Sequence, residues 1–140
     1  MDHRAKPWAW FGAVSVAMAL TLAGMVSTSL AGTFSCEGAK KIEAEVSPDA
    51  ELVSVGCSYK DYKKHNSLHF DVKIKNISAQ PQRYRVNIFL DNGKAVGGLI
   101  PDKGKPPVLQ PGEEAAFTYP VQGMADVADA VTILVKTLSP

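Results

Sequence analysis

The stretch LHFDVKIKNISAQPQRYRVNIFLDNGK, from Leu68 to Lys94, decides the fold class of this chain. Apolar side chains recur at every second position in its first part, Leu68 to Ile74, and again in its second part, Tyr84 to Leu90. A period of two is typical of a β-strand that buries one face. The residues between the two parts contain Pro81, which suits a loop. The stretch therefore predicts two amphipathic strands.

We expect these two strands to pair antiparallel, with Ile74 opposite Tyr84, because both apolar sets then share one face. In that register each lysine of the first strand faces an arginine of the second, and like charges directly across strands destabilise a sheet. A solvated face whose long side chains splay apart is the interpretation that the pattern favours, and the functional alternative is a surface for an acidic protein partner or for anionic head groups. Its candidate residues are four cations and one apolar anchor: Lys73, Lys75, Arg83, Arg85 and Phe89.

Asp91-Asn92-Gly93-Lys94 ends the second strand and predicts a type I′ hairpin turn, in which both central residues have positive φ. Further strands are expected at 51–62, 95–100, 115–119 and 130–138, with Cys57 facing inward. Residues 37–46 suit either a helical turn or an edge strand, and 124–130 suit a short helical turn. About seven short strands separated by turn signals indicate an antiparallel, immunoglobulin-like β-sandwich.

The N-terminal residues 1–31 have the three parts of a secretory signal: basic Arg4 and Lys6, an uncharged run at 8–26, and small residues ending at Ala31. The run of 8–26 is also long enough for an uncleaved anchor in the inner membrane. Either reading places an exported domain at 32–140, in the periplasm or another extracytoplasmic compartment.

The exported part contains two cysteines, Cys36 and Cys57. In an oxidising compartment such a pair predicts one disulfide, which closes a loop of about 20 residues and stabilises the fold by roughly 3 kcal/mol. A redox-active or metal-binding pair is the alternative, and the spacing is not C-x-x-C.

The sequence contains none of the common catalytic or nucleotide-binding motifs, so we expect a non-enzyme with no catalytic residues and no cofactor. Beyond residue 31 basic and acidic side chains balance, which argues against a nucleic-acid partner. His65 and His69 are candidate copper or zinc ligands, with Met124 as a candidate third ligand, but the interpretation we favour is two solvated side chains. Asn76-Ile77-Ser78 matches the N-glycosylation acceptor, which matters in a eukaryotic secretory route, but the interpretation we favour is a turn.

Two motifs resemble the bacterial FxLYD-type immunoglobulin-like domain: the hairpin Ile88-Phe89-Leu90-Asp91-Asn92-Gly93-Lys94, and Leu109-x-Pro111-Gly112-Glu113 followed by Phe117. Asn76 also matches that family's Asn-x-Ser position. The likeness covers roughly residues 68–137, and the family's Tyr between Leu90 and Asp91 is missing. The resemblance implies an exported, non-catalytic domain.

Together these features predict an exported β-sandwich that acts by binding an unidentified protein partner, as an accessory or assembly subunit of a periplasmic or membrane-associated complex. Contact with the membrane is expected through the N-terminal segment. The alternative is a periplasmic copper-binding protein that uses His65 and His69.

The predicted disulfide is open to a direct chemical test. In exported protein, Cys36 and Cys57 should resist a thiol reagent under denaturing conditions and should react only after a reductant is added. Reaction of both thiols without reductant contradicts the disulfide.

Overall fold

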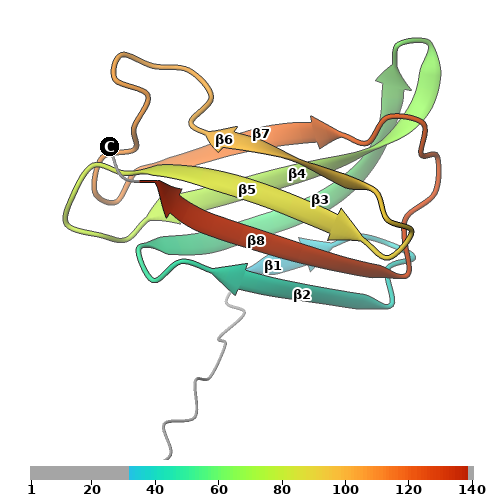
Figure 1. Ribbon diagram of the computed structural model, residues 1–140, viewed down its shortest axis with the longest axis horizontal. Helices are drawn as coiled ribbons and strands as arrows, with labels where there is room; N and C mark the ends of the chain where they lie inside the picture. The colour runs from blue at the N-terminus through green and yellow to red at the C-terminus, as the bar shows by residue number, and fades with distance from the viewer. Residues whose placement is uncertain (1–31, 139–140) are drawn as a thin grey trace, which may run out of the picture.

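The computed structural model describes residues 32–138, which form eight strands in two sheets of four. The strands are β1 (Thr33–Ser35), β2 (Lys41–Val46), β3 (Ala50–Tyr62), β4 (His65–Asn76), β5 (Arg83–Leu90), β6 (Ala95–Ile100), β7 (Glu114–Pro120) and β8 (Ala130–Leu138). The first sheet has the order β1-β3-β4-β7 and the second β2-β8-β5-β6. The two sheets lie face to face as a β-sandwich (Figure 1).

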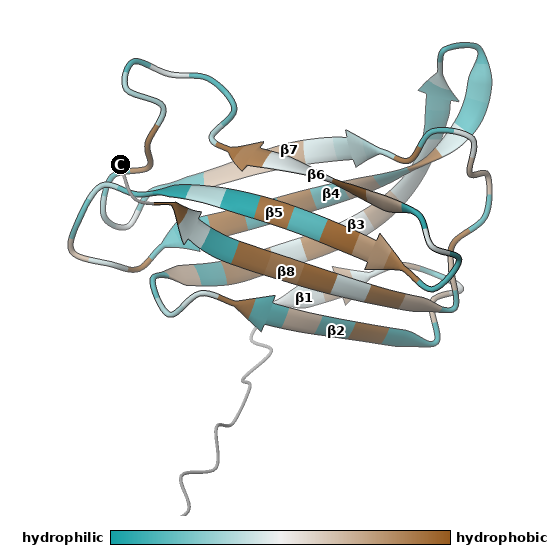
Figure 2. Ribbon diagram, viewed as in Figure 1, coloured by the Kyte–Doolittle hydropathy of each residue, from teal (hydrophilic) through white to brown (hydrophobic). Residues whose placement is uncertain are grey.

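The core lies between β4 of the first sheet and β5 of the second. The alternate residues Leu68, Phe70, Val72 and Ile74 are fully buried, as are Tyr84, Val86 and Ile88. Hydropathy alternates along β5, as the period of two predicts, whereas β8 is apolar over most of its length (Figure 2). Removing these apolar faces from water is the main driving force for the sandwich.

The predicted pairing of Ile74 with Tyr84 is wrong. β4 pairs with β3 and β7, and β5 pairs with β6 and β8, so the two strands belong to different sheets. Their apolar faces meet across the core instead of lying side by side. Alternation shows that a strand has a buried face, and both arrangements bury that face equally well.

The sheets are mixed and not purely antiparallel. β1 runs parallel to β3, and β2 runs parallel to β8, whereas the remaining pairings are antiparallel. Residues 41–46 therefore form an edge strand and not a helical turn, and residues 124–130 form no helix. The N-terminal signal or anchor predicted for 1–31 lies outside the described residues. Within 32–138 no helix is long and apolar enough to cross a membrane.

The turn after β5 forms at the predicted place but is not of type I′. Gly93 has a φ of 81°, whereas Asn92 keeps a negative φ. The Gly93 N–H donates to the carbonyl of Leu90 at 3.0 Å, and the Leu90 N–H donates to the carbonyl of Lys94 at 2.9 Å. This pattern is a type I turn closed by a left-handed glycine, a common three-residue hairpin.

Asn76 ends β4 and is fully buried. Its amide nitrogen donates to the carbonyls of Gln80 at 2.8 Å and Leu109 at 2.9 Å. Its amide oxygen accepts from the N–H of Ser78 at 2.9 Å and from the Ser78 hydroxyl at 2.8 Å. The side chain thus holds the loop that carries the chain into the second sheet. An amide so enclosed is not accessible as a glycosylation acceptor.

The predicted disulfide between Cys36 and Cys57 is confirmed, with a Cα–Cα distance of 4.7 Å. It ties β1 and the loop after it to β3. Cys57 packs against the core, as predicted. The bond therefore holds the N-terminal strands against the body of the sandwich.

Asn76→Ala should lower the free energy of unfolding by roughly 2–4 kcal/mol, because the backbone groups that bind the amide are left buried without partners. Urea unfolding monitored by circular dichroism measures the change. Asn66→Ala, at an exposed strand position, serves as the control and should have little effect. Equal unfolding midpoints for Asn76→Ala and the wild type contradict the role given to this amide.

Candidate functional site

The five residues of the predicted basic patch lie on the outer faces of two different sheets. Lys73 and Lys75 lie on β4 in the first sheet, whereas Arg83 and Arg85 lie on β5 in the second, together with Phe89. The structure therefore brings the arginines and Phe89 together, but it does not bring them beside the lysines. The patch was inferred from the pairing of β4 with β5, which does not occur.

Lys73 has an acidic partner on its own sheet. Its ammonium forms an ion pair with Glu114 of the neighbouring strand β7, and this hydrogen bond lowers the pKa of Glu114. Lys75 also lies directly opposite Glu114 in the β4–β7 register. These lysines are thus compensated by an acid and do not form an unbalanced cationic patch.

The second sheet contains a like-charge pair that the sequence reasoning missed. Arg85 lies directly opposite Lys136 of β8. Arg83 lies two residues before Arg85 on β5, on the same face of the sheet. Arg83 donates from Nε to the carbonyl of Pro101 at 3.3 Å. No ion pair joins Arg83, Arg85 or Lys136 to an acid within residues 32–138. Like charges opposite each other lower sheet stability, and three cations gather on this face without an acidic partner among the described residues.

Apolar side chains continue from these cations along the same outer face. Leu99 lies opposite Arg85 on β6, Leu134 lies opposite Asn87, and Phe89 lies opposite Thr132. The Phe89 side chain is 46% exposed, which is unusual for a large apolar residue. We call this surface the basic–apolar face; it consists of Arg83, Arg85, Phe89, Leu99, Leu134 and Lys136.

Lys136 and Leu134 were missed because they lie on the last strand, about 50 positions from Arg85. Nothing in the local pattern says which strand pairs with β5. The one available signal was Lys136 itself, the single cation in the apolar strand 130–138, which marks an outward position. The sequence therefore identified two cations of this face but not the third.

The two candidate metal ligands lie in different environments. His65 is exposed beside the turn that joins β3 to β4, but His69 is buried, so the prediction of a solvated His69 is wrong. The Nδ1 of His69 lies 2.8 Å from the carbonyl of Ser67, and its ring packs edge-on against Tyr62. His65 and His69 are four positions apart along β4, which separates their Cα atoms by about 13 Å. No three potential metal ligands cluster within residues 32–138, and the copper alternative thus gains no support.

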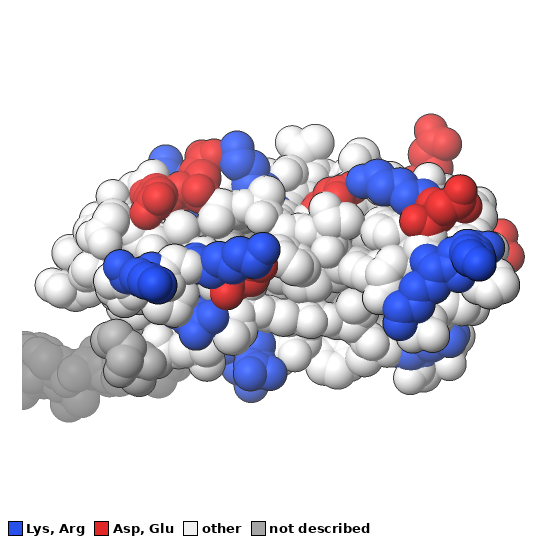
Figure 3. Space-filling model, turned by 90° about the horizontal axis from the view of Figure 1, so that it is seen from above, with Lys and Arg blue, Asp and Glu red and all other residues white. Residues whose placement is uncertain are grey.

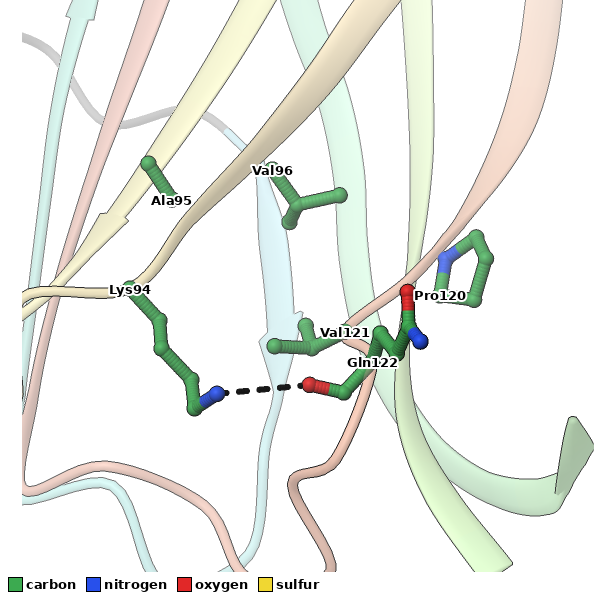
Figure 4. Close-up of a pocket in the computed structure, with 6 residues that line it drawn as sticks. All are labelled: Lys94, Ala95, Val96, Pro120, Val121 and Gln122. Atoms are coloured by element: carbon green, nitrogen blue, oxygen red, sulfur yellow. Dashed lines mark hydrogen bonds between the residues drawn. The ribbon is translucent and has the colours of Figure 1, made fainter. Parts of the chain in front are cut away.

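A shallow pocket of about 330 Å³ lies where the start of β6 meets the end of β7. Figure 4 shows Lys94 reaching across it to the backbone carbonyl of Gln122, at 3.3 Å. Its other walls are Ala95, Val96, Pro120 and Val121. The lining includes no carboxylate, imidazole, hydroxyl or thiol side chain, and its one ionisable group, Lys94, donates to the Gln122 carbonyl.

Asp71 is a further charged group on the outer face of the first sheet. It accepts hydrogen bonds from the hydroxyls of Ser58 and Thr118, and Lys60 lies 3.7 Å away. Burial raises the pKa of Asp71, but the bonds from Thr118 and Ser58 and the charge of Lys60 outweigh burial and lower the pKa overall. The fold therefore stabilises the charged form of the Asp71 carboxyl relative to the protonated form.

Asp71→Asn should lower stability by about 1 kcal/mol at neutral pH, since the carboxylate is the better acceptor. A depressed folded-state pKa adds stability that is present above the unfolded value of 3.8 and is lost as the pH falls through the folded value. The difference between wild type and variant should thus shrink between about pH 5 and pH 3 in urea unfolding. A difference that stays constant over this interval contradicts this assignment.

Comparison of the chain with protein-family models, with curated proteins and with solved structures gives no match. The resemblance to the FxLYD-type domain therefore stays a prediction. The assignment of function rests on the geometry of the described residues.

Proposed function

We propose that this chain is an exported, non-catalytic immunoglobulin-like binding module that serves as an accessory or assembly subunit of a periplasmic or membrane-associated complex. The observation that carries the proposal is the basic–apolar face. In this face two cations without a described acidic partner, Arg85 and Lys136, lie opposite each other, near the exposed ring of Phe89. Arginine and aromatic side chains are enriched where protein surfaces bind one another.

The strand order supports the immunoglobulin-like class. In that class strands A, B and E form one sheet, and strands F, C and C′ lie in the other. Here β3-β4-β7 and β8-β5-β6 follow the same order and the same antiparallel directions. The place next to β8, where strand G belongs, is taken by the parallel strand β2.

The Cys36–Cys57 disulfide supports export, because such bonds persist mainly in oxidising compartments. The resemblance to a bacterial domain family and the leader-like residues 1–31 favour the periplasm as that compartment. An acidic protein surface with an apolar pocket for Phe89 is the partner that complements the basic–apolar face.

Charge reversal on each sheet tests the proposal. Tagged protein is recovered from detergent-solubilised membranes, and the co-purifying proteins are compared between Arg85→Glu/Lys136→Glu and the wild type. We expect a partner that the wild type retains to be lost from this variant, because the partner's acidic surface would be repelled by the two new carboxylates.

Lys73→Glu/Lys75→Glu is the matched control, since it reverses two charges on the opposite outer face. It should retain the partner, and circular dichroism should show that both variants remain folded. Equal recovery of all partners by both variants and the wild type removes the basic–apolar face from the proposal.

A further inference from the structure

The hairpin between β3 and β4 extends beyond both sheets. β1 pairs with β3 only as far as Gly56, and β7 pairs with β4 only as far as His69. The β3–β4 ladder continues to Tyr62 opposite His65, so its end is a two-stranded ribbon that projects from the sandwich (Figure 1). We call residues 59–66 the hairpin tip.

The turn at the hairpin tip has an unfavourable backbone. Lys63 has a φ of 52° and Lys64 a φ of 68°, and they are the only residues other than glycine with positive φ within 32–138. Two positive φ values in a two-residue loop form a type I′ turn, for which Asn-Gly is the preferred sequence. Lysine at both positions costs about 1–2 kcal/mol per residue relative to glycine. Strain kept at an exposed turn suggests a role for the side chains themselves.

The side chains of the hairpin tip are basic and amphipathic. Lys60, Lys63 and Lys64 are exposed, and Asp61 is the one acid within the hairpin tip. Lys60 also lies 3.7 Å from Asp71, so the uncompensated charges are those of Lys63 and Lys64. Lys63 places its ammonium 5.3 Å from the centre of the Tyr62 ring, and Tyr59 is 46% exposed. Neither Lys63 nor Lys64 forms an ion pair with a described acid. From above, basic and acidic side chains are seen at the end from which the hairpin projects, and further basic side chains lie over the rest of this face (Figure 3).

We propose that the hairpin tip docks onto an anionic membrane surface. A protruding tip is convex and cannot enclose a peptide or a small molecule, but it can lie on a flat layer of head groups. Lysines on flexible stems suit a diffuse negative surface, whereas the planar fork of arginine suits a single carboxylate. Tyrosine is enriched at the membrane–water interface, where its ring and hydroxyl are both solvated favourably. This site is separate from the basic–apolar face.

The test is sedimentation of the exported protein with vesicles that contain about 30% phosphatidylglycerol in phosphatidylcholine, compared with pure phosphatidylcholine, at low and high salt. Lys63→Asn/Lys64→Gly removes both charges and supplies the preferred turn. We expect partition onto anionic vesicles at low salt to fall by about tenfold, while the urea midpoint rises because strain is relieved. Any contribution of residues 1–31 is the same in every variant.

Lys103→Asn/Lys105→Asn is the matched control, since it removes two exposed lysines from the loop after β6. It should partition as the wild type does. Equal losses in both variants, or no loss in the tip variant, overturn the proposal. Soluble polyglutamate is the second probe. If the protein binds polyglutamate through Lys63 and Lys64 but does not bind vesicles, the membrane proposal is overturned and the partner of the tip is an acidic polypeptide.

Discussion

The buried amide of Asn76 is the contact on which the arrangement of the two sheets depends. It stands at the end of β4, where the chain leaves the first sheet, and its four hydrogen bonds satisfy groups from the following loop and from Leu109. The backbone of Asn76 also pairs with Glu113 and Gly112. Because these bonds fix the loop that follows β4, the chain crosses to β5 in the second sheet and does not fold back to pair with β4.

A second polar contact supports the same end of the sandwich. The carbonyl of Asp49 accepts from the N–H of Ile77 at 3.1 Å and from the hydroxyl of buried Tyr84 at 2.8 Å. Burial raises the pKa of Tyr84 to about 12, so the hydroxyl remains a donor at physiological pH. Because Tyr84 lies near the start of β5 and Asp49 directly precedes β3, this bond links the two sheets where the chain crosses between them.

The two surfaces proposed for binding lie on different parts of this scaffold and differ in chemistry. The basic–apolar face is a flat sheet surface with arginines and an aromatic ring, which suits a protein partner. The hairpin tip is a narrow projection with lysines and tyrosines, which suits a layer of head groups. A subunit of a membrane-associated complex needs contacts of both kinds.

The sequence by itself determined which apolar residues of β4, β5 and β8 face inward, because a period of two depends only on local geometry. In β3 a register shift after Leu52 breaks the period, so Leu52 is buried and Tyr59 is exposed. It also located the turn at Gly93 and the disulfide, since turn chemistry and a single pair of cysteines leave few choices. Only the tertiary structure decided which strands are neighbours: β4 and β5 meet across the core, and Lys136 lies opposite Arg85. It also decided that His69 is buried and that Lys63 and Lys64 are strained. These features depend on contacts between distant residues, and alternation along one strand carries no information about what covers it.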